Sequence, residues 1–142
     1  MAIWHPESKL EDMKERGKGT LVEHVGIEFL EIGDNYIKAR MPVDRRTIQP
    51  FGILHGGASA VLAETLGSVA ANLCVDRKIQ RCVGLEINAN HIYPASSGYV
   101  YGIVTPVHVG KTTHVWEIRI TDEKENLVCI SRITLAVLEN RK

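Results

Sequence analysis

The chain has 142 residues, of which 44% are hydrophobic and 24% charged, an ordinary composition for one globular domain with a real core. Seventeen basic residues balance 17 acidic ones, so net charge gives no reason to expect nucleic acid or an anionic membrane as partner. The N-terminus is charged too early for a signal peptide, no stretch is apolar enough to span a bilayer, and three scattered cysteines favour reduced thiols. We therefore expect a cytoplasmic protein with a single domain over residues 1–142.

The first predicted elements are a short helix and a hairpin. The capping-box pattern from Ser8 to Glu11 predicts a helix over about 8–16. Residues 25–32 and 36–41 flank a Gly-Asp-Asn turn signal, which predicts two antiparallel strands. Apolar and polar residues alternate in the second strand, so one of its faces should be wet.

The longest apolar stretch covers residues 50–75 and contains one formal charge, Glu64. From Gly56 onward it is too long for a strand and rich in helix formers, so it predicts a helix buried on most faces. Glu64, Ser68 and Asn72 recur every four residues and share one stripe. Small residues are expected beside that stripe and larger ones opposite it: Gly57, Ala60, Gly67 and Ala71, and then Leu62, Leu66, Val69 and Leu73. A carboxylate in such a helix must be neutralised, hydrogen-bonded or used in chemistry.

The predicted start of this helix, at His55-Gly56-Gly57, suits a developing oxyanion. First-turn N–H groups have no partner inside the helix and carry the positive end of its dipole. Gly56 and Glu64, however, are about 12 Å apart along the helix axis, at 1.5 Å per residue. One carbonyl group can be reached by both only if a second copy of the helix lies antiparallel beside the first, as in a two-fold dimer with two shared sites.

Strand signals dominate the chain after Arg81. Val83, Leu85, Ile87 and Ala89 alternate with polar residues and glycine, which predicts one apolar face. Three further strands are predicted over 99–109, 113–121 and 127–138. The order is a helix, a hairpin, a long buried helix and a four-stranded meander. This order predicts an α+β fold in which an antiparallel β-sheet is wrapped around a long central α-helix.

Four stretches carry a resemblance to a known family: QPFGILHGGASAVLAETLGS, GLEINANH, VHVGKTTHVWEI and CISRITLAVL. The chain resembles the hotdog-fold thioesterases over nearly its whole length. It is most similar to the PaaI-like group, which includes 1,4-dihydroxy-2-naphthoyl-CoA thioesterases, the enterobactin proofreading thioesterase and the Arthrobacter-type 4-hydroxybenzoyl-CoA thioesterase. The specific feature is HGG followed by a glutamate eight residues after its first glycine.

The resemblance implies that the chain hydrolyses an aryl- or medium-chain acyl-CoA to free acid and CoA. It implies that Glu64 acts as nucleophile or general base, and that the Gly56 N–H polarises the thioester carbonyl. Gln49 and His55 match side chains that contact the thioester and the leaving sulfur. Ser68 matches a hydroxyl that positions the hydrolytic water.

The resemblance also implies substrate-binding residues. His91 matches a residue beside the acyl group, with Gly84 near it. The CoA phosphates and nucleotide are expected at a second set: His108, Val109, Gly110, Lys111, Thr112, Thr113 and Arg132. The chain has Tyr93 where relatives often have arginine, and Gly110-Lys111 where many have Gly-Arg or Gly-Ser. These departures leave a substrate linked to an acyl carrier protein open. The resemblance further implies a homodimer that often pairs into a homotetramer.

Other interpretations stay open at this stage. Glu64 could be a structural carboxylate, His55 could only order the loop, and the Ser68 hydroxyl could bond back to its own helix. The rival functions are proofreading of acyl groups misloaded on a carrier protein, non-catalytic acyl-CoA binding, and hydration, for which no second acid or base is evident. No cofactor and no metal are expected, because the histidines lack ligand spacing such as HExxH and Gly110-Lys111-Thr112 lacks the first glycine of a P-loop.

Overall fold

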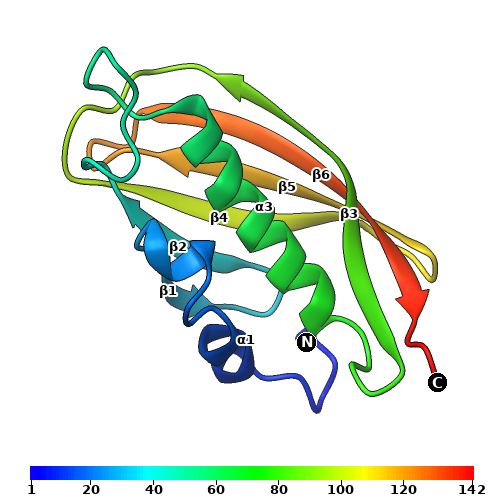
Figure 1. Ribbon diagram of the computed structural model, residues 1–142. Coiled ribbons are helices and arrows are strands. Elements are labelled where there is room, and N and C mark those ends of the chain that lie inside the picture. The colour runs from blue at the N-terminus through cyan, green and yellow to red at the C-terminus, as the bar shows by residue number, and fades with distance from the viewer.

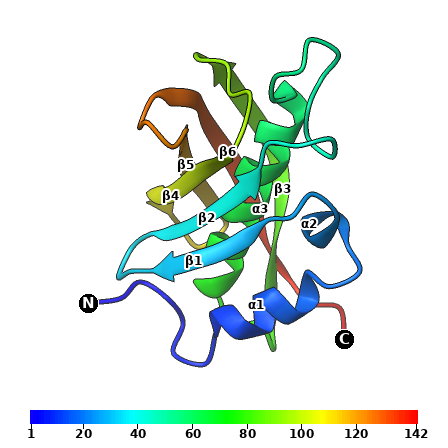
Figure 2. The ribbon, with the colours of Figure 1, turned by 90° about the vertical axis from the view of Figure 1, so that its left-hand side faces the viewer.

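The computed structural model describes all 142 residues as one antiparallel sheet of six strands that curves around a long helix (Figure 1). The elements in chain order are α1 (Leu10–Arg16), α2 (Leu21–His24), β1 (Glu28–Ile32), β2 (Ile37–Pro42), α3 (Gly56–Leu73), β3 (Gln80–His91), β4 (Tyr99–Val109), β5 (Thr113–Thr121) and β6 (Leu127–Glu139). Figure 2 shows β1 and β2 wrapped past α3, with α1 below them. The expected fold class is confirmed. None of the helices combines the length and apolar character needed to cross a bilayer.

The strand order is β1-β2-β4-β5-β6-β3. The predicted meander is therefore wrong for one of its four strands, because only β4, β5 and β6 follow one another in the sheet. Strand β3 pairs with β6, from Gln80 opposite Glu139 to His91 opposite Cys129. The reason is the position of α3: it crosses the concave face of the sheet after β2 and delivers the chain to the far edge. Strand β3 is left with one edge unpaired.

The N-terminal predictions hold in outline and fail in detail. The hairpin of β1 and β2 forms as expected, and Ile37, Ala39 and Met41 point into the core with no exposed surface. Helix α1 forms, but its predicted capping box does not, because the Ser8 hydroxyl donates to the Val75 carbonyl oxygen at 3.3 Å. Helix α2 was not predicted, although Thr20 caps it by accepting from the Val22 N–H at 3.3 Å.

Helix α3 packs its large apolar side chains against the concave face of the sheet, and Leu62, Leu66 and Leu73 are buried as predicted. Gly67 and Ala71 are also buried, so the prediction that they lie in an open groove is wrong. A Cβ on Gly67 would lie 2.4 Å from Cγ2 of Ile133, which shows that this glycine lets α3 approach β6 closely.

The outward face of α3 is rotated relative to the expectation. The partly or fully exposed residues of the helix are Gly56, Gly57, Ala58, Ala60, Val61, Glu64, Thr65, Ser68, Val69 and Asn72. The predicted Glu64-Ser68-Asn72 stripe therefore does face outward, whereas Val69, expected in the core, lies on the same side. Because this helix has apolar residues on all of its faces, the sequence pattern could not predict which face packs against the sheet.

Strand β3 changes the phase of its alternation at a bulge between Gly84 and Glu86. Before the bulge, Cys82 is buried and Gly84 faces α3, while Leu85 is 65% exposed. After the bulge, Ile87 and Ala89 pack against the core. The prediction of one continuous apolar face is wrong, because an extra residue in one strand moves every following side chain to the other face.

Candidate active site

Helix α3 begins with a free backbone donor. His55 caps the helix from extended backbone, and its Nδ1 accepts from the Gly57 N–H at 2.7 Å. The His55 N–H donates to the Thr47 carbonyl oxygen at 2.8 Å, which ties the start of the helix to the preceding loop. The Gly56 N–H has no hydrogen-bond acceptor in the chain. It lies at the positive end of the helix dipole, where it can donate to a ligand oxygen.

The end of β3 closes over this helix start. A Cβ on Gly56 would lie 2.8 Å from Nε2 of His91, so the His91 side chain packs directly against the backbone of the helix start. A pocket of about 360 Å³ opens beside them. Its lining includes four residues expected at the site or on the substrate, namely Gln49, Gly56, His91 and Tyr93. The Gln49 carbonyl oxygen Oε1 accepts from the Phe51 N–H, which leaves the amide nitrogen of Gln49 free to donate.

Glu64 stands apart from this pocket. Its carboxylate is half-buried and has neither a hydrogen bond nor an ion pair within the chain. Burial raises the pKa of Glu64 above its usual value, because removing a carboxylate from water disfavours its charged form. A Cβ on Gly84 would lie 2.8 Å from its Oε1, so the backbone of β3 approaches the carboxylate closely. Because no donor binds the Glu64 carboxylate, these contacts do not support the interpretation of Glu64 as a structural carboxylate.

Ser68 lies one helical turn beyond Glu64 with its hydroxyl unbonded. The back-bond to the helix that the sequence left open is made by Thr65 instead, whose Oγ1 donates to the Val61 carbonyl oxygen at 2.7 Å. Asn72, which the sequence placed on the same stripe without a role, ties α3 to β3. Its Oδ1 accepts from the Cys82 N–H at 2.9 Å and its Nδ2 donates to the Cys82 carbonyl oxygen at 3.1 Å.

The expected site residues thus lie in two separate groups within one chain, which we call half-sites for the proposal below. The donor half-site comprises Gln49, His55, Gly56, His91 and Tyr93; the acid half-site comprises Glu64, Ser68 and Gly84. Gly84, expected near the acyl group with His91, is seven positions before His91 on β3, about 23 Å at 3.3 Å per residue, so the two lie in different half-sites of one chain.

The residues expected to hold CoA also fall in two places. His108, Val109, Gly110, Lys111, Thr112 and Thr113 surround the turn between β4 and β5. Thr113 is opposite Ala136 on β6, whereas Arg132 is opposite Glu117. Arg132 is therefore four residues away from the turn along β6, about 13 Å. Its side chain is exposed and unpaired.

The cysteines take no part in either half-site. All three are unpaired, as expected. Burial raises the pKa of Cys74 to about 12 and that of Cys82 to about 11, so neither is a thiolate at neutral pH.

Comparison with known proteins shows the class first. The fold is that of a solved thioesterase from Haemophilus influenzae, with a TM-score of 0.91 and 45% identity over 96% of this chain and 95% of that one. A mutant thioesterase from Pseudomonas aeruginosa has a TM-score of 0.94 and 45% identity over 98% of this chain and 100% of that one. The expected hotdog fold is confirmed.

The sequence comparisons then show the family. A model of the thioesterase superfamily matches residues 51–129, and the chain belongs to that superfamily. The 1,4-dihydroxy-2-naphthoyl-CoA hydrolase of Escherichia coli is 52% identical over 136 residues, 96% of this chain and 99% of the relative. The proofreading thioesterase EntH of Cronobacter turicensis is 50% identical over 136 residues, 96% of this chain and 98% of the relative. The protein is a thioesterase.

Proposed function

We propose that the enzyme hydrolyses aryl- or medium-chain acyl-CoA thioesters in composite sites, each built from the acid half-site of one copy and the donor half-site of a second. The observation that carries this proposal is the separation of two unpartnered groups on α3. The Gly56 N–H has no acceptor and Glu64 has no donor, and about 12 Å of helix lies between them. A carbonyl group can contact both only across an interface.

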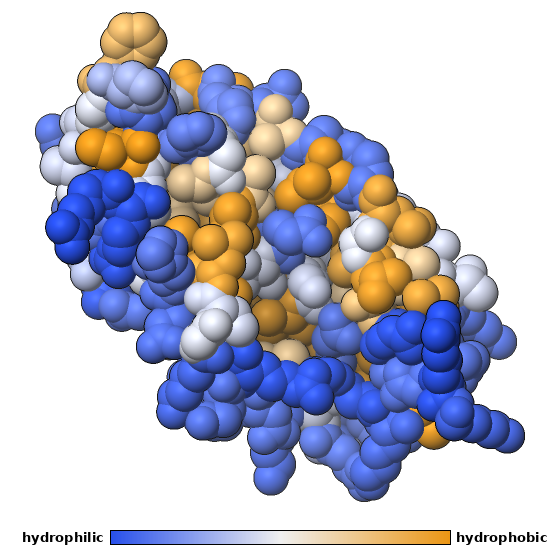
Figure 3. Space-filling view, viewed as in Figure 1, coloured by the Kyte–Doolittle hydropathy of each residue, from blue (hydrophilic) through white to orange (hydrophobic).

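The unpaired edge of β3 supports a two-fold interface. This strand is 12 residues long and exposes Val83 and Leu85, which is a liability in a monomer. Antiparallel pairing of β3 with its copy would continue the sheet and bring the outward faces of two α3 helices together. Figure 3 shows apolar patches along α3 and β3 on this side, with a hydrophilic rim toward the C-terminus. Small residues near the start of α3, Gly57 and Ala60, permit close approach.

In such a dimer, Gly84 and Glu64 of one copy meet Gly56 and His91 of the other. Glu64 either activates a water held by Ser68 or attacks the carbonyl carbon itself. In both routes the carbon–sulfur bond breaks and CoA leaves as the thiol after taking a proton. The activated water supplies the new oxygen of the carboxylic acid in the first route; in the second, the anhydride formed between Glu64 and the acyl group is hydrolysed by water, which restores Glu64 and releases the acid. The Gly56 N–H stabilises the oxyanion, and the side chains of Gln49 and His55 contact the thioester and the sulfur. Assembly of two such dimers into a tetramer is the further expectation.

The CoA phosphates are proposed to bind near the β4–β5 turn, where Lys111 supplies charge, His108 supplies imidazole and Thr112 and Thr113 supply hydroxyls. Tyr93, at the mouth of the donor half-site, contacts the pantetheine arm. Arg132 reaches the phosphates only from another copy of the chain, since it is about 13 Å from the turn along β6.

A second candidate is proofreading of acyl groups misloaded on a carrier protein. It is favoured by the 50% identity to the proofreading thioesterase EntH. The two candidates share one chemistry and differ in what holds the thiol.

The test is a thiol-release screen over aryl, branched and straight-chain acyl-CoAs, repeated with the same acyl groups on an acyl carrier protein. We expect hydrolysis of aryl or medium-chain CoA esters at a kcat/KM above that for the carrier-linked forms. The reverse order would select the proofreading function. Tight binding of the esters without release of thiol would contradict both and leave a binding module.

A further inference from the structure

A second hollow, of about 290 Å³, lies beyond Glu64 on the outward side of α3, toward the end of that helix. Its floor continues the stripe of the acid half-site through Ser68, Val69 and Asn72. Three arginines from three different segments complete its wall: Arg16 from α1, Arg77 from the connection after α3, and Arg81 from β3. We call these three residues the arginine cluster.

The arginine cluster has no anionic partner. None of its members forms an ion pair, and Arg81 donates only to uncharged acceptors, the Glu139 carbonyl oxygen at 3.2 Å and Asn140 Oδ1 at 3.4 Å. Arg77 donates from Nη1 to the Met13 sulfur at 3.1 Å, and its Nε is buried without any partner. A thioether is a weak acceptor, so Arg77 is left with unmet donors.

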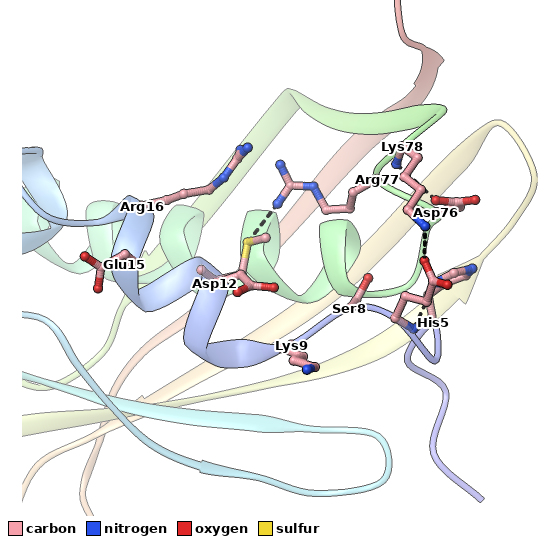
Figure 4. A pocket seen from close by; sticks show the side chains of 11 residues that line it. His5, Ser8, Lys9, Asp12, Glu15, Arg16, Asp76, Arg77 and Lys78 are labelled. Atoms are coloured by element: carbon pink, nitrogen blue, oxygen red, sulfur yellow. Dashed lines mark hydrogen bonds and ion pairs between the residues drawn. The ribbon is translucent and has the colours of Figure 1, made fainter.

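Two charges of the cluster, those of Arg16 and Arg77, lie close together. Figure 4 shows the guanidinium groups of Arg16 and Arg77 pointing toward each other. Burial and the nearby charge of Arg16 both lower the pKa of Arg77, and Asp12, the acidic residue that most favours its charge, forms no ion pair with it. Like charges brought together, with a buried donor unpaired, cost free energy in the free protein. An anion in the hollow offsets that cost.

The spacing of residues along α3 and along β3 gives the distance from the Glu64 carboxylate to the arginine cluster. Along α3, Ser68 and Asn72 are one and two steps of four residues beyond Glu64, about 6 Å and 12 Å. Along β3, Gly84 touches Glu64 and Arg81 is three residues earlier, about 10 Å. An acyl group whose carbonyl lies at Glu64 and whose chain follows the floor of the hollow therefore ends among the arginines.

We propose that the arginine cluster binds an anionic group, a carboxylate, at the end of the acyl chain farthest from the thioester. The enzyme is then selective for half-thioesters of dicarboxylic acids. This inference rests on the proposed function and names the acyl group for it. Such a substrate needs an apolar surface for its chain and hydrogen-bond donors for its charged end. In the proposed complex, Val69 and the aliphatic part of Arg81 contact the methylene groups, and the guanidinium groups donate to the terminal carboxylate.

The test compares two CoA esters of equal chain length, octanoyl-CoA and its ω-carboxylated counterpart, suberoyl-CoA. In the unmodified enzyme we expect kcat/KM for suberoyl-CoA to exceed that for octanoyl-CoA by roughly tenfold or more, the scale of one charge-assisted hydrogen bond. Arg16→Gln and Arg77→Gln should each lower this ratio by roughly tenfold. Arg16 is exposed on a surface helix, so its variant tests the inference even if Arg77→Gln folds poorly.

Lys78→Gln is the matched control. It removes one positive charge next to Arg77 in sequence, but Lys78 is 74% exposed in its side chain, pairs with Glu7 and does not line the hollow. Its ratio of kcat/KM for suberoyl-CoA to that for octanoyl-CoA should equal that of the unmodified enzyme. If this ratio falls equally in Arg16→Gln, Arg77→Gln and Lys78→Gln, the preference comes from the overall positive charge of the region, and the inference is overturned.

The remaining outcomes are also decisive. Hydrolysis of octanoyl-CoA without preference for suberoyl-CoA overturns this inference and leaves the proposed function standing. If Arg16→Gln and Arg77→Gln weaken inhibition by free CoA as much as they weaken suberoyl-CoA turnover, the cluster binds CoA phosphates and the inference is wrong. Failure to hydrolyse any ester overturns the proposed function itself.

Discussion

The two half-sites along α3 differ in their surroundings and in the group that each leaves without a hydrogen-bond partner. The donor half-site, at Gly56, is crowded: the loop before α3, the helix start and His91 at the end of β3 meet there, and its free group is an N–H. The acid half-site, at Glu64, is open to one side, and its free group is a carboxylate that only the backbone of β3 approaches.

This difference teaches how one helix can supply complementary groups without their neutralising each other. About 12 Å of α3 keeps the N–H and the carboxylate apart in each chain. In the proposed dimer, a second copy with a substrate between the two satisfies both groups.

The largest effect is expected at the acid half-site. Glu64→Ala should lower kcat for acyl-CoA hydrolysis by about 10³-fold or more, because no other carboxylate lies in either half-site. Thiol release measures it, with circular dichroism to establish that the fold is kept. Glu11→Ala, which removes an exposed glutamate that pairs with Lys14, is the control. Near-full turnover in Glu64→Ala would remove Glu64 from the mechanism.

The composite site predicts complementation between inactive chains. Unfolded and refolded together in equal amounts, Glu64→Gln and His55→Ala chains should regain about a quarter of the unmodified activity, because half of the dimers are mixed and each mixed dimer has one intact site. Each variant refolded alone provides the baseline. A mixture no more active than its parts would place both half-sites within one chain.

At the donor half-site, Gly56→Ala keeps the backbone N–H but adds a Cβ that would lie 2.8 Å from Nε2 of His91, so the His91 ring or the helix start must shift. Because this shift disturbs the alignment of the N–H with the oxyanion, kcat should fall, by up to about 10²–10³-fold, the full cost of losing one oxyanion donor. Adding His91→Ala to Gly56→Ala removes the clash and should recover part of kcat. A double variant no faster than Gly56→Ala would show that crowding against His91 is not the cause.

Between the half-sites and the sheet, Gly67→Ala should affect stability rather than chemistry. Its Cβ would lie 2.4 Å from Cγ2 of Ile133, and overpacking of this kind costs about 1–3 kcal/mol, a fall in Tm of roughly 2–4 °C per kcal/mol at this length. Calorimetry measures the fall, and KM and kcat measured well below the Tm should stay within about twofold. A Tm unchanged by the substitution would contradict the close packing of α3 on β6.

The smallest effect concerns the pH dependence of stability. Burial raises the pKa of Glu64 in the folded state, so the folded protein binds a proton more tightly than the unfolded chain does. Stability from this group is complete below the ordinary pKa of a glutamate and is lost as pH rises through the raised value. Glu64→Gln should therefore raise the free energy of unfolding at pH 7 by less than about 1 kcal/mol for this half-exposed group, with a correspondingly small rise in Tm, and the gain should vanish at pH 4. A lower Tm at pH 7 would mean that the carboxylate has a stabilising partner.

The sequence alone determined the elements and the chemistry of the exposed stripe on α3. A run of helix formers from Gly56 without proline fixed the long helix, and β-branched runs separated by turn residues fixed the strands. The four-residue spacing from Glu64 to Ser68 was enough to place both side chains on one outward face, because that spacing is local. The match to HGG and its distant glutamate pointed to the family that the comparisons show.

Only the tertiary structure decided how these parts meet. The crossing of α3 sends β3 to the far edge of the sheet, which no local pattern specifies. A bulge after Gly84 turns Leu85 outward and brings the backbone of β3 to Glu64. The arginine cluster joins three segments that are far apart in the chain or in different elements. Periodicity reports which residues share a face, whereas strand order, bulges and the partner of each face depend on long-range packing.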